Sequence, residues 1–187
     1  MSESFANLQT GRWDAKNSFV EVVAVPNIDK IRIGFRQYDK TQAEGERVSF
    51  CIDYYMKNTV ANAFSQIILS GAVKSRKTKW EQEGCPDENK TNFFEATPGG
   101  TEINGETVWR VVRILPGRTG YRIAGFQAPG KRDEKGLITP AGTPRFVAVP
   151  LSPIDLCSFA KAVERAVSIN DMHRYFEWRA VEKNRNR

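Results

Sequence analysis

The pattern that most constrains the fold is an alternating strand followed directly by an amphipathic helix, and it occurs twice. Over residues 48–71 apolar residues first alternate, as in a half-buried strand, and then recur with helical spacing up to a glycine. Residues 145–167 repeat this order, and at an offset of 95 Ile52 falls on Val147 and Phe64 on Phe159. A helix with one apolar stripe must bury that stripe against another element. The two junctions therefore predict helices packed on sheets.

Further segments of period two precede each junction. The clearest covers residues 30–38, where Ile31, Ile33 and Phe35 share one face, which we expect to be the core face. The other expected strands cover residues 5–13, 19–25 and 47–55, and then 107–115, 120–128 and 145–149, with a short strand near 93–94. The expected fold class is α+β, built of two β-β-β-β-α repeats in which each antiparallel sheet is backed by a helix.

The two half-repeats, at about residues 5–71 and 93–170, are expected to form one domain over residues 1–187. A polar connection over 72–92 joins them. Ser152-Pro153 and Asp155 predict the start of the second helix, and Asn170-Asp171 is a candidate break in it. Residues 129–144 read as a flexible loop, and residues 182–187 as a basic tail.

The positive charge lies in one half of the chain. The net charge is +6, yet residues 1–95 carry 13 Lys/Arg and 13 Asp/Glu, whereas residues 96–187 carry 15 and 9. A one-sided basic field favours polyanions such as nucleic acid or an acidic protein surface. Many mildly basic proteins have no such partner, so the charge alone leaves both interpretations open.

The composition predicts a cytoplasmic protein without a membrane partner. No apolar run approaches the roughly 20 residues that span a bilayer. The first 12 residues lack the apolar core of a secretory signal. Cys51, Cys85 and Cys157 are widely spaced and odd in number, which is typical of reduced thiols.

Signals of catalysis are few. His173 is the only histidine, no cysteine lies near it in the sequence, and no nucleophile-elbow or metalloprotease motif occurs. We therefore expect a non-catalytic protein with no metal and no cofactor. Gly117 and Gly120 match the G-x-x-G loop of KH domains, but strands flank them where that motif needs helices, so a hairpin turn is the better interpretation.

Several antiparallel strands followed by one helix, twice over, resemble the whirly, Pur and positive-cofactor-4 group of single-stranded nucleic-acid binders. The resemblance covers about residues 5–170 and is one of topology, so no residue of the group's binding signature is transferred. It implies curved four-stranded sheets, each backed by a helix and packed pseudo-symmetrically. It also implies single-stranded nucleic acid as the ligand.

A single-strand binder needs cations for the phosphates and flat side chains for stacked bases on one surface. The candidate residues follow the expected strand at 30–38, the basic run at 74–80 and the strands of the second half. They are Lys30, Arg32, Arg36, Tyr38, Lys74, Arg76, Lys77, Lys79, Trp80, Arg110, Arg113, Tyr121 and Arg122. Alternatively, the strand residues line an ordinary solvated sheet face, and the basic run is a solvated linker with Trp80 docked on the core.

The sequence favours a largely sequence-independent, non-catalytic protein that binds single-stranded nucleic acid, DNA before RNA. The apolar helix stripes also suggest a homodimer or a higher oligomer. A protein-interaction or assembly module, such as an accessory protein of a phage or mobile element, is the main alternative. A small-molecule enzyme is the third.

Overall fold

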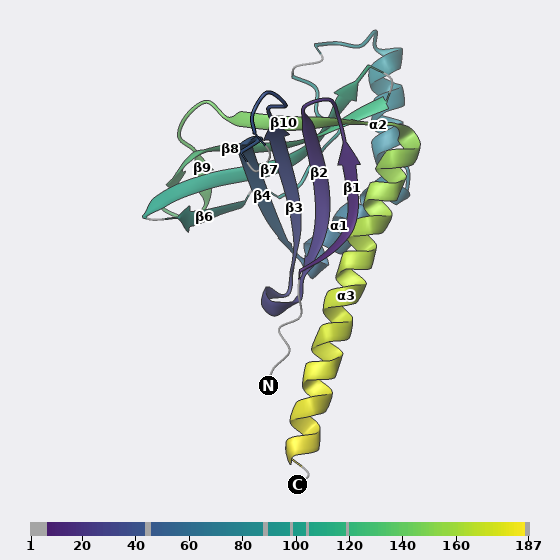
Figure 1. Cartoon of the computed structure of the whole chain (residues 1–187). Helices are drawn as coiled ribbons and strands as arrows, with labels where there is room; N and C mark the ends of the chain where they lie inside the picture. Colours follow the sequence, from purple (N-terminus) through teal and green to yellow (C-terminus); the bar gives the residue numbers. More distant parts are fainter. Residues whose placement is uncertain are drawn as a thin grey trace.

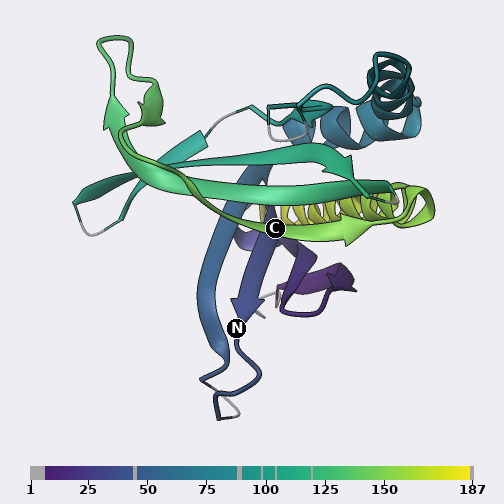
Figure 2. The same ribbon diagram turned by 90° about the horizontal axis from the view of Figure 1, so that it is seen from above.

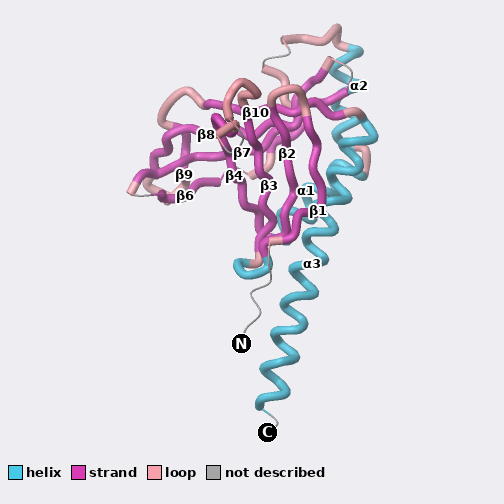
Figure 3. The backbone as a smooth tube through the Cα atoms, viewed as in Figure 1, coloured by secondary structure: helices cyan, strands magenta, loops and turns pink. Residues whose placement is uncertain are grey.

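The computed structural model describes residues 7–43, 46–87, 90–97, 99–103, 105–118 and 120–185 (Figure 1). Two antiparallel sheets, three α-helices and a 3-10 turn make up the described chain (Figure 3). In chain order the elements are β1 (Leu8–Asp14), β2 (Ser18–Val25), η1 (Pro26–Ile28), β3 (Lys30–Tyr38), β4 (Val48–Lys57), α1 (Asn58–Leu69), α2 (Ala72–Gln82), β5 (Phe94–Glu95), β6 (Gly99–Ile103), β7 (Glu106–Gly117), β8 (Gly120–Arg132), β9 (Ile138–Pro140), β10 (Arg145–Leu151) and α3 (Pro153–Arg185).

The first sheet is a meander with the order β1-β2-β3-β4, so β4 is one of its edges. In β3, Ile31, Ile33 and Phe35 are each 0% exposed, which confirms the predicted core face. The neighbouring strand β4 aligns Ile52 with Phe35 and Tyr54 with Ile33, so these side chains share that face. The alternation read from the sequence therefore gives the correct inner surface of this sheet.

The second sheet has six strands, in the order β10-β8-β7-β5, with β6 paired to β7 and β9 paired to β8. Gly117 pairs with Gly120, which confirms the predicted hairpin between two strands. Part of the predicted loop at 129–144 is instead ordered. The strand β8 continues to Arg132 and pairs there with β9, where Ile138 packs on a small apolar cluster around Trp109.

The two sheets cross and share one apolar core (Figure 2). Phe35 of the first sheet lies against Gly125 of the second, so closely that a Cβ added to Gly125 would be 2.4 Å from the Phe35 ring. The core also takes Phe64 from α1 and Phe159 from α3. Because both sheets and both helices supply this core, the two halves depend on each other for burial.

The first helix, α1, confirms the predicted segment after β4. A second helix, α2, follows at Ala72–Gln82, where only a polar connection is expected from the sequence. Gly71 has φ of +83°, a left-handed conformation that lets the chain turn from α1 into α2. Residues 72–82 contain no Gly or Pro and are rich in good helix formers, so α2 forms although it has a single buried residue, Val73. Ion pairs at i,i+4 spacing, such as Lys79–Glu83, support it.

The last helix, α3, runs without a break from Pro153 to Arg185, so the break considered at Asn170 is wrong. Asn170 stays helical because its buried amide donates hydrogen bonds to the backbone oxygen of Lys30 (3.0 Å) and to Oδ1 of Asn58 (2.9 Å). The predicted helix start is confirmed: Ser152 Oγ accepts the Asp155 N–H at 3.1 Å, and Asp155 accepts the Ser152 N–H at 3.1 Å. Of the expected basic tail, 182–185 belong to α3, and 186–187 lie outside the described residues.

Helix α3 follows β10 of the second sheet but packs on the first, along β1, β2 and β3 (Figure 1). Thr10 Oγ1 of β1 donates a hydrogen bond to the backbone oxygen of Ala162 at 2.8 Å. The strand–helix order of the two halves agrees with the expected plan, but the sheets differ in strand number and α2 follows only the first. The internal repeat therefore stays a prediction. No helix among the described residues is long and apolar enough to cross a membrane.

Candidate nucleic-acid interface

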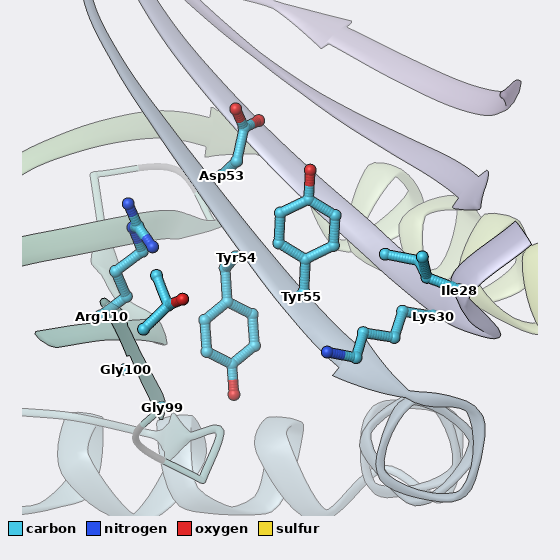
Figure 4. A pocket seen from close by; sticks show the side chains of 9 residues that line it. Ile28, Lys30, Asp53, Tyr54, Tyr55, Gly99, Gly100 and Arg110 are labelled. Atoms are coloured by element: carbon cyan, nitrogen blue, oxygen red, sulfur yellow. The ribbon is translucent and has the colours of Figure 1, made fainter. Parts of the chain in front are cut away.

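Two of the predicted cations, one from each half, meet beside the open edge of β4. A hollow of about 420 Å³ lies there, and Lys30, Tyr55 and Arg110 line it together with the backbone of Gly99 and Gly100 (Figure 4). Lys30 and Tyr55 come from the first sheet, whereas Arg110 and the glycines come from β7 and β6 of the second. The contact between the sheets therefore creates a site that neither sheet forms alone.

Lys30 and Arg110 make no ion pair with any residue in the described ranges. The Arg110 Nε donates a hydrogen bond to Gln127 Oε1 at 2.8 Å, and this partner is neutral. Burial lowers the pKa of the Arg110 guanidinium from its usual value, and nearby Asp53 opposes that shift. A guanidinium of this kind remains charged at neutral pH, so it presents a half-buried cation to an incoming anion.

The one carboxylate in the hollow, Asp53, is already engaged. Its Oδ1 is 2.8 Å from Arg36 Nη2 and 3.8 Å from Arg32 Nε. Glu21 pairs with the same two arginines, at 2.8 Å to Arg32 and 3.8 Å to Arg36. The two acids and two arginines neutralise one another across the outer face of β2, β3 and β4. The excess positive charge is therefore left at Lys30 and Arg110, and the guanidinium groups of Arg32 and Arg36 are held by acids of their own sheet.

Tyr55 supplies an exposed ring in the hollow, whereas its neighbour Tyr54 belongs to the core. The Tyr55 side chain is 43% exposed and Tyr54 is 5% exposed, because alternate residues of β4 face opposite sides of the sheet. The Tyr54 hydroxyl donates a hydrogen bond to the Thr97 carbonyl at 2.5 Å, and burial raises its pKa to about 12. Tyr54 thus anchors the segment before β6, and Tyr55 is free to contact a ligand.

Cationic and aromatic side chains continue along β4 beyond this hollow. Gln127, the partner of Arg110, also lines a second hollow with Phe50 and Arg145. The Arg145 guanidinium carbon lies 3.9 Å from the centre of the Phe50 ring. Phe50 and Tyr55 are five residues apart in β4, a distance of roughly 17 Å. This odd spacing puts their side chains on opposite faces of the strand, so the two hollows meet only at its edge. We call the surface formed by Lys30, Phe50, Tyr55, Arg110 and Arg145 the β4 groove.

No protein-family model matches the chain, and no curated protein sequence is significantly similar to it.

The predicted residues of the basic run lie on α2, away from the β4 groove. Arg76 donates a hydrogen bond to the Phe93 carbonyl at 2.6 Å, and Lys77 and Lys79 pair with Glu81 and Glu83. Trp80 docks on the core: its ring meets Phe93 edge-on at 5.8 Å, and Nε1 donates to the Pro86 carbonyl at 2.8 Å. Lys74, on the same helix, is exposed.

Tyr121, predicted to stack on a base, is 5% exposed and packs edge-on against Phe93 at 6.1 Å. That prediction is wrong, because Tyr121 lies on the inner face of β8, where the strand alternation did not reveal which side is covered. Tyr38 is partly buried at the far end of β3, where its hydroxyl donates to the Ala15 carbonyl at 2.9 Å.

The two remaining arginines lie on the outer face of the second sheet. Arg113 pairs with Glu95 at 2.5 Å and lies over Phe126, with 4.8 Å to the ring centre. Arg122 Nε donates to the Pro116 carbonyl at 2.7 Å. Phe126 stacks on Phe146, which is 53% exposed. This face carries aromatic surface, but the acid beside Arg113 lowers its positive charge.

Sequence reasoning missed Phe50, Tyr55 and Arg145 as site residues. Tyr55 could have been predicted, because assigning Tyr54 to the core places its neighbour in the strand on the outer side of the sheet. Arg145 and Phe50 are brought together by the contact between β10 and β4, which belong to different sheets. No local pattern carries that information.

Proposed function

We propose that the protein binds single-stranded nucleic acid along the β4 groove, without catalysis and with little sequence preference. The observation that carries the proposal is the convergence of unpaired Lys30 and Arg110 beside the exposed ring of Tyr55. Cations without protein partners release counterions when they meet phosphates, which is the main source of affinity for nucleic acids. An exposed ring beside them accepts a base of any sequence.

In this mechanism Lys30 and Arg110 contact successive phosphates and Tyr55 stacks on the base between them. Arg145 and Phe50 offer a second cation and ring in the other hollow, on the opposite side of β4, so a strand would have to pass around the edge of β4 to meet both pairs. Gly99 and Gly100 present backbone without side chains at the wall of the groove, which allows a close approach. A duplex would present its stacked bases edge-on, and the rings could not reach their faces.

The test is a titration of the full chain with labelled oligo-dT, single-stranded RNA and duplex DNA at several salt concentrations. We expect the single strands to bind more tightly than the duplex, with an affinity that falls as salt rises, by roughly 0.7 in the log–log slope per contacted phosphate. Comparison of the two single strands decides between DNA and RNA. Absence of binding to all three at low salt would refute the proposal.

Variants locate the binding surface. Replacing Lys30 and Arg110 together by glutamine should weaken binding and lower the salt slope by about 1.4, because two phosphate contacts are lost. Tyr55→Ala should cost about 1–3 kcal/mol with the slope unchanged, because a stacking contact carries no charge. The matched control is Lys74→Gln with Lys79→Gln on α2, which also removes two cations. If the control weakens binding as much as the groove variant, the groove is not the site.

A further inference from the structure

The final part of α3 leaves the body of the protein and exposes large apolar side chains. His173 is the last buried residue, and every described residue after it is exposed. In Figure 1 this part of the helix extends beyond both sheets. Tyr175, Trp178 and Val181 are 50%, 54% and 60% exposed. A projecting helix in water is usually polar around its circumference, so we expect the apolar side chains of this one to be covered by a partner.

The exposed apolar residues do not continue the face that α3 uses against its own sheet. The buried residues Phe159, Val163, Ala166 and Asn170 recur at spacings of three and four and define the inner face. Continued by two more turns, through buried His173, that face reaches Glu177. Trp178 lies about 100° away from it, because each helical residue advances by that angle. The surface around Trp178 is therefore a second face of the helix, although Asp171 and Arg174 at its beginning also contact Asn58 and Asp29 of the domain.

Charged residues flank Trp178 in such an order that, when two copies of this helix lie antiparallel, each charge faces an opposite charge. The stripe is Asp171, Arg174, Trp178, Glu182 and Arg185, at spacings of four and three residues, so all five lie on one side of the helix. Against a second copy running in the opposite direction, with the two tryptophans facing each other, Asp171 falls opposite Arg185. Arg174 falls opposite Glu182 in the same arrangement. Each pair occurs twice, as a two-fold axis requires.

We infer that the projecting part of α3 pairs with the same part of a second copy of this chain, antiparallel and centred on Trp178. Within one chain Arg174 already contacts Asp171 and lies 3.2 Å from Asp29, and its five donor hydrogens allow it to donate to the Glu182 carboxylate of the other copy as well. The contact is small, so the dimer is weak, with a dissociation constant of roughly micromolar order. Antiparallel pairing places the two domains at opposite ends of a short helical rod. The inference rests on the residues of α3 alone and does not depend on the proposed function.

Sedimentation of the full chain over a range of concentrations tests the pairing. The wild type should pass from monomer to dimer as concentration rises. Trp178→Ala should weaken the dimer at least about thirtyfold, the effect of losing a central tryptophan. Phe176→Ala is the matched control: this ring is 55% exposed and lies on the opposite side of the helix, so the dimer should persist. A wild type that stays monomeric, or a Phe176→Ala variant as weak as Trp178→Ala, overturns the inference.

A mixing experiment tests the direction of the pairing. Arg174→Glu places two acids opposite each other and Glu182→Arg places two cations opposite each other, so each variant alone should dimerise at least about tenfold more weakly. An equimolar mixture of the two should recover the wild-type affinity, because each chain then meets the opposite charge. Circular dichroism of each variant checks that the monomer is folded. A mixture that associates no better than its components overturns the antiparallel register.

Discussion

A close approach between the two sheets predicts a large effect from a single methyl group. Gly125 pairs with Val112 on one side and Val147 on the other, in the middle of the second sheet. An added Cβ would lie 2.4, 2.7 and 2.9 Å from three atoms of the Phe35 ring. Phe35 is 0% exposed between its own strand neighbours, so the ring has no free space into which to rotate.

Gly125→Ala should therefore lower the free energy of unfolding by about 2 kcal/mol. Overpacking a core costs about 1–3 kcal/mol. The usual gain of replacing glycine in a strand, about 0.5–1 kcal/mol, offsets part of it. In a chain of this length the loss corresponds to a melting temperature lower by roughly 4–8 °C. Urea unfolding with an unchanged m-value would measure the loss directly.

A matched glycine and a double variant make the test specific to the sheet contact. At Gly34, also in the middle of a strand, a Cβ would meet Glu21 Oε1 at 3.0 Å, Glu21 Cγ at 3.1 Å and Asp53 Oδ1 at 3.2 Å, so these side chains need to move by only a few tenths of an ångström. Gly34→Ala should change stability by less than about 1 kcal/mol. Phe35→Leu together with Gly125→Ala should be less damaging than the sum of the two changes, by at least about 1 kcal/mol. Additive effects, or a Gly125→Ala variant as stable as the wild type, would refute this packing of the sheets.

Three further predictions concern anchoring groups. Burial raises the pKa of Tyr54 from 10.0 to about 12, so its neutral hydroxyl stabilises the fold fully below pH 10, and this stabilisation is lost as the pH rises toward 12. The free energy of unfolding of the wild type should therefore fall between pH 9 and 12 in urea unfolding. In Tyr54→Phe this fall should be smaller by about 2 kcal/mol. Asn170→Ala removes the amide that donates to the Lys30 carbonyl and to Asn58 Oδ1, so thermal unfolding should show a loss of about 2 kcal/mol, and a loss below 0.5 kcal/mol would mean that water replaces the amide. Ser152→Ala should cost about 1 kcal/mol in chemical denaturation through loss of the α3 cap, whereas the neighbouring change Ser158→Ala, on an exposed turn of the same helix, should be nearly neutral.

The parts of the fold that the sequence predicts are those specified by short-range periodicity. The inner face of β3 follows from the alternation of Ile31, Ile33 and Phe35, and the start of α3 follows from the side-chain chemistry of Ser152 and Asp155. Helix α2 escaped prediction because its residues have good helix propensity but no apolar stripe. The helix at Asn170 escaped because a buried amide, bonded to a strand 140 residues away, replaces the solvent contact that asparagine usually needs.

The candidate site could be predicted only in part, for a related reason. The sequence identified Lys30 and Arg110 as cations on strand faces, but their meeting depends on how the two sheets cross. It could not show that Arg32 and Arg36 face Glu21 and Asp53, because these acids reach them from neighbouring strands. Neutralisation across a sheet is fixed by register, and register is a property of pairs of strands.

The hydrogen bond between Thr10 and Ala162 joins groups 152 residues apart, and this separation has a consequence for how the chain acquires its shape. When a ribosome has completed β4, the first sheet has all its strands, but its apolar face still lacks the helix that will lie along β1 and β2. That cover is synthesised only after the whole second sheet. Contacts between residues so far apart in the chain slow folding, and until they form the sheet exposes an apolar face that promotes aggregation. Shortening the chain before α3 should therefore yield aggregation rather than a smaller folded protein.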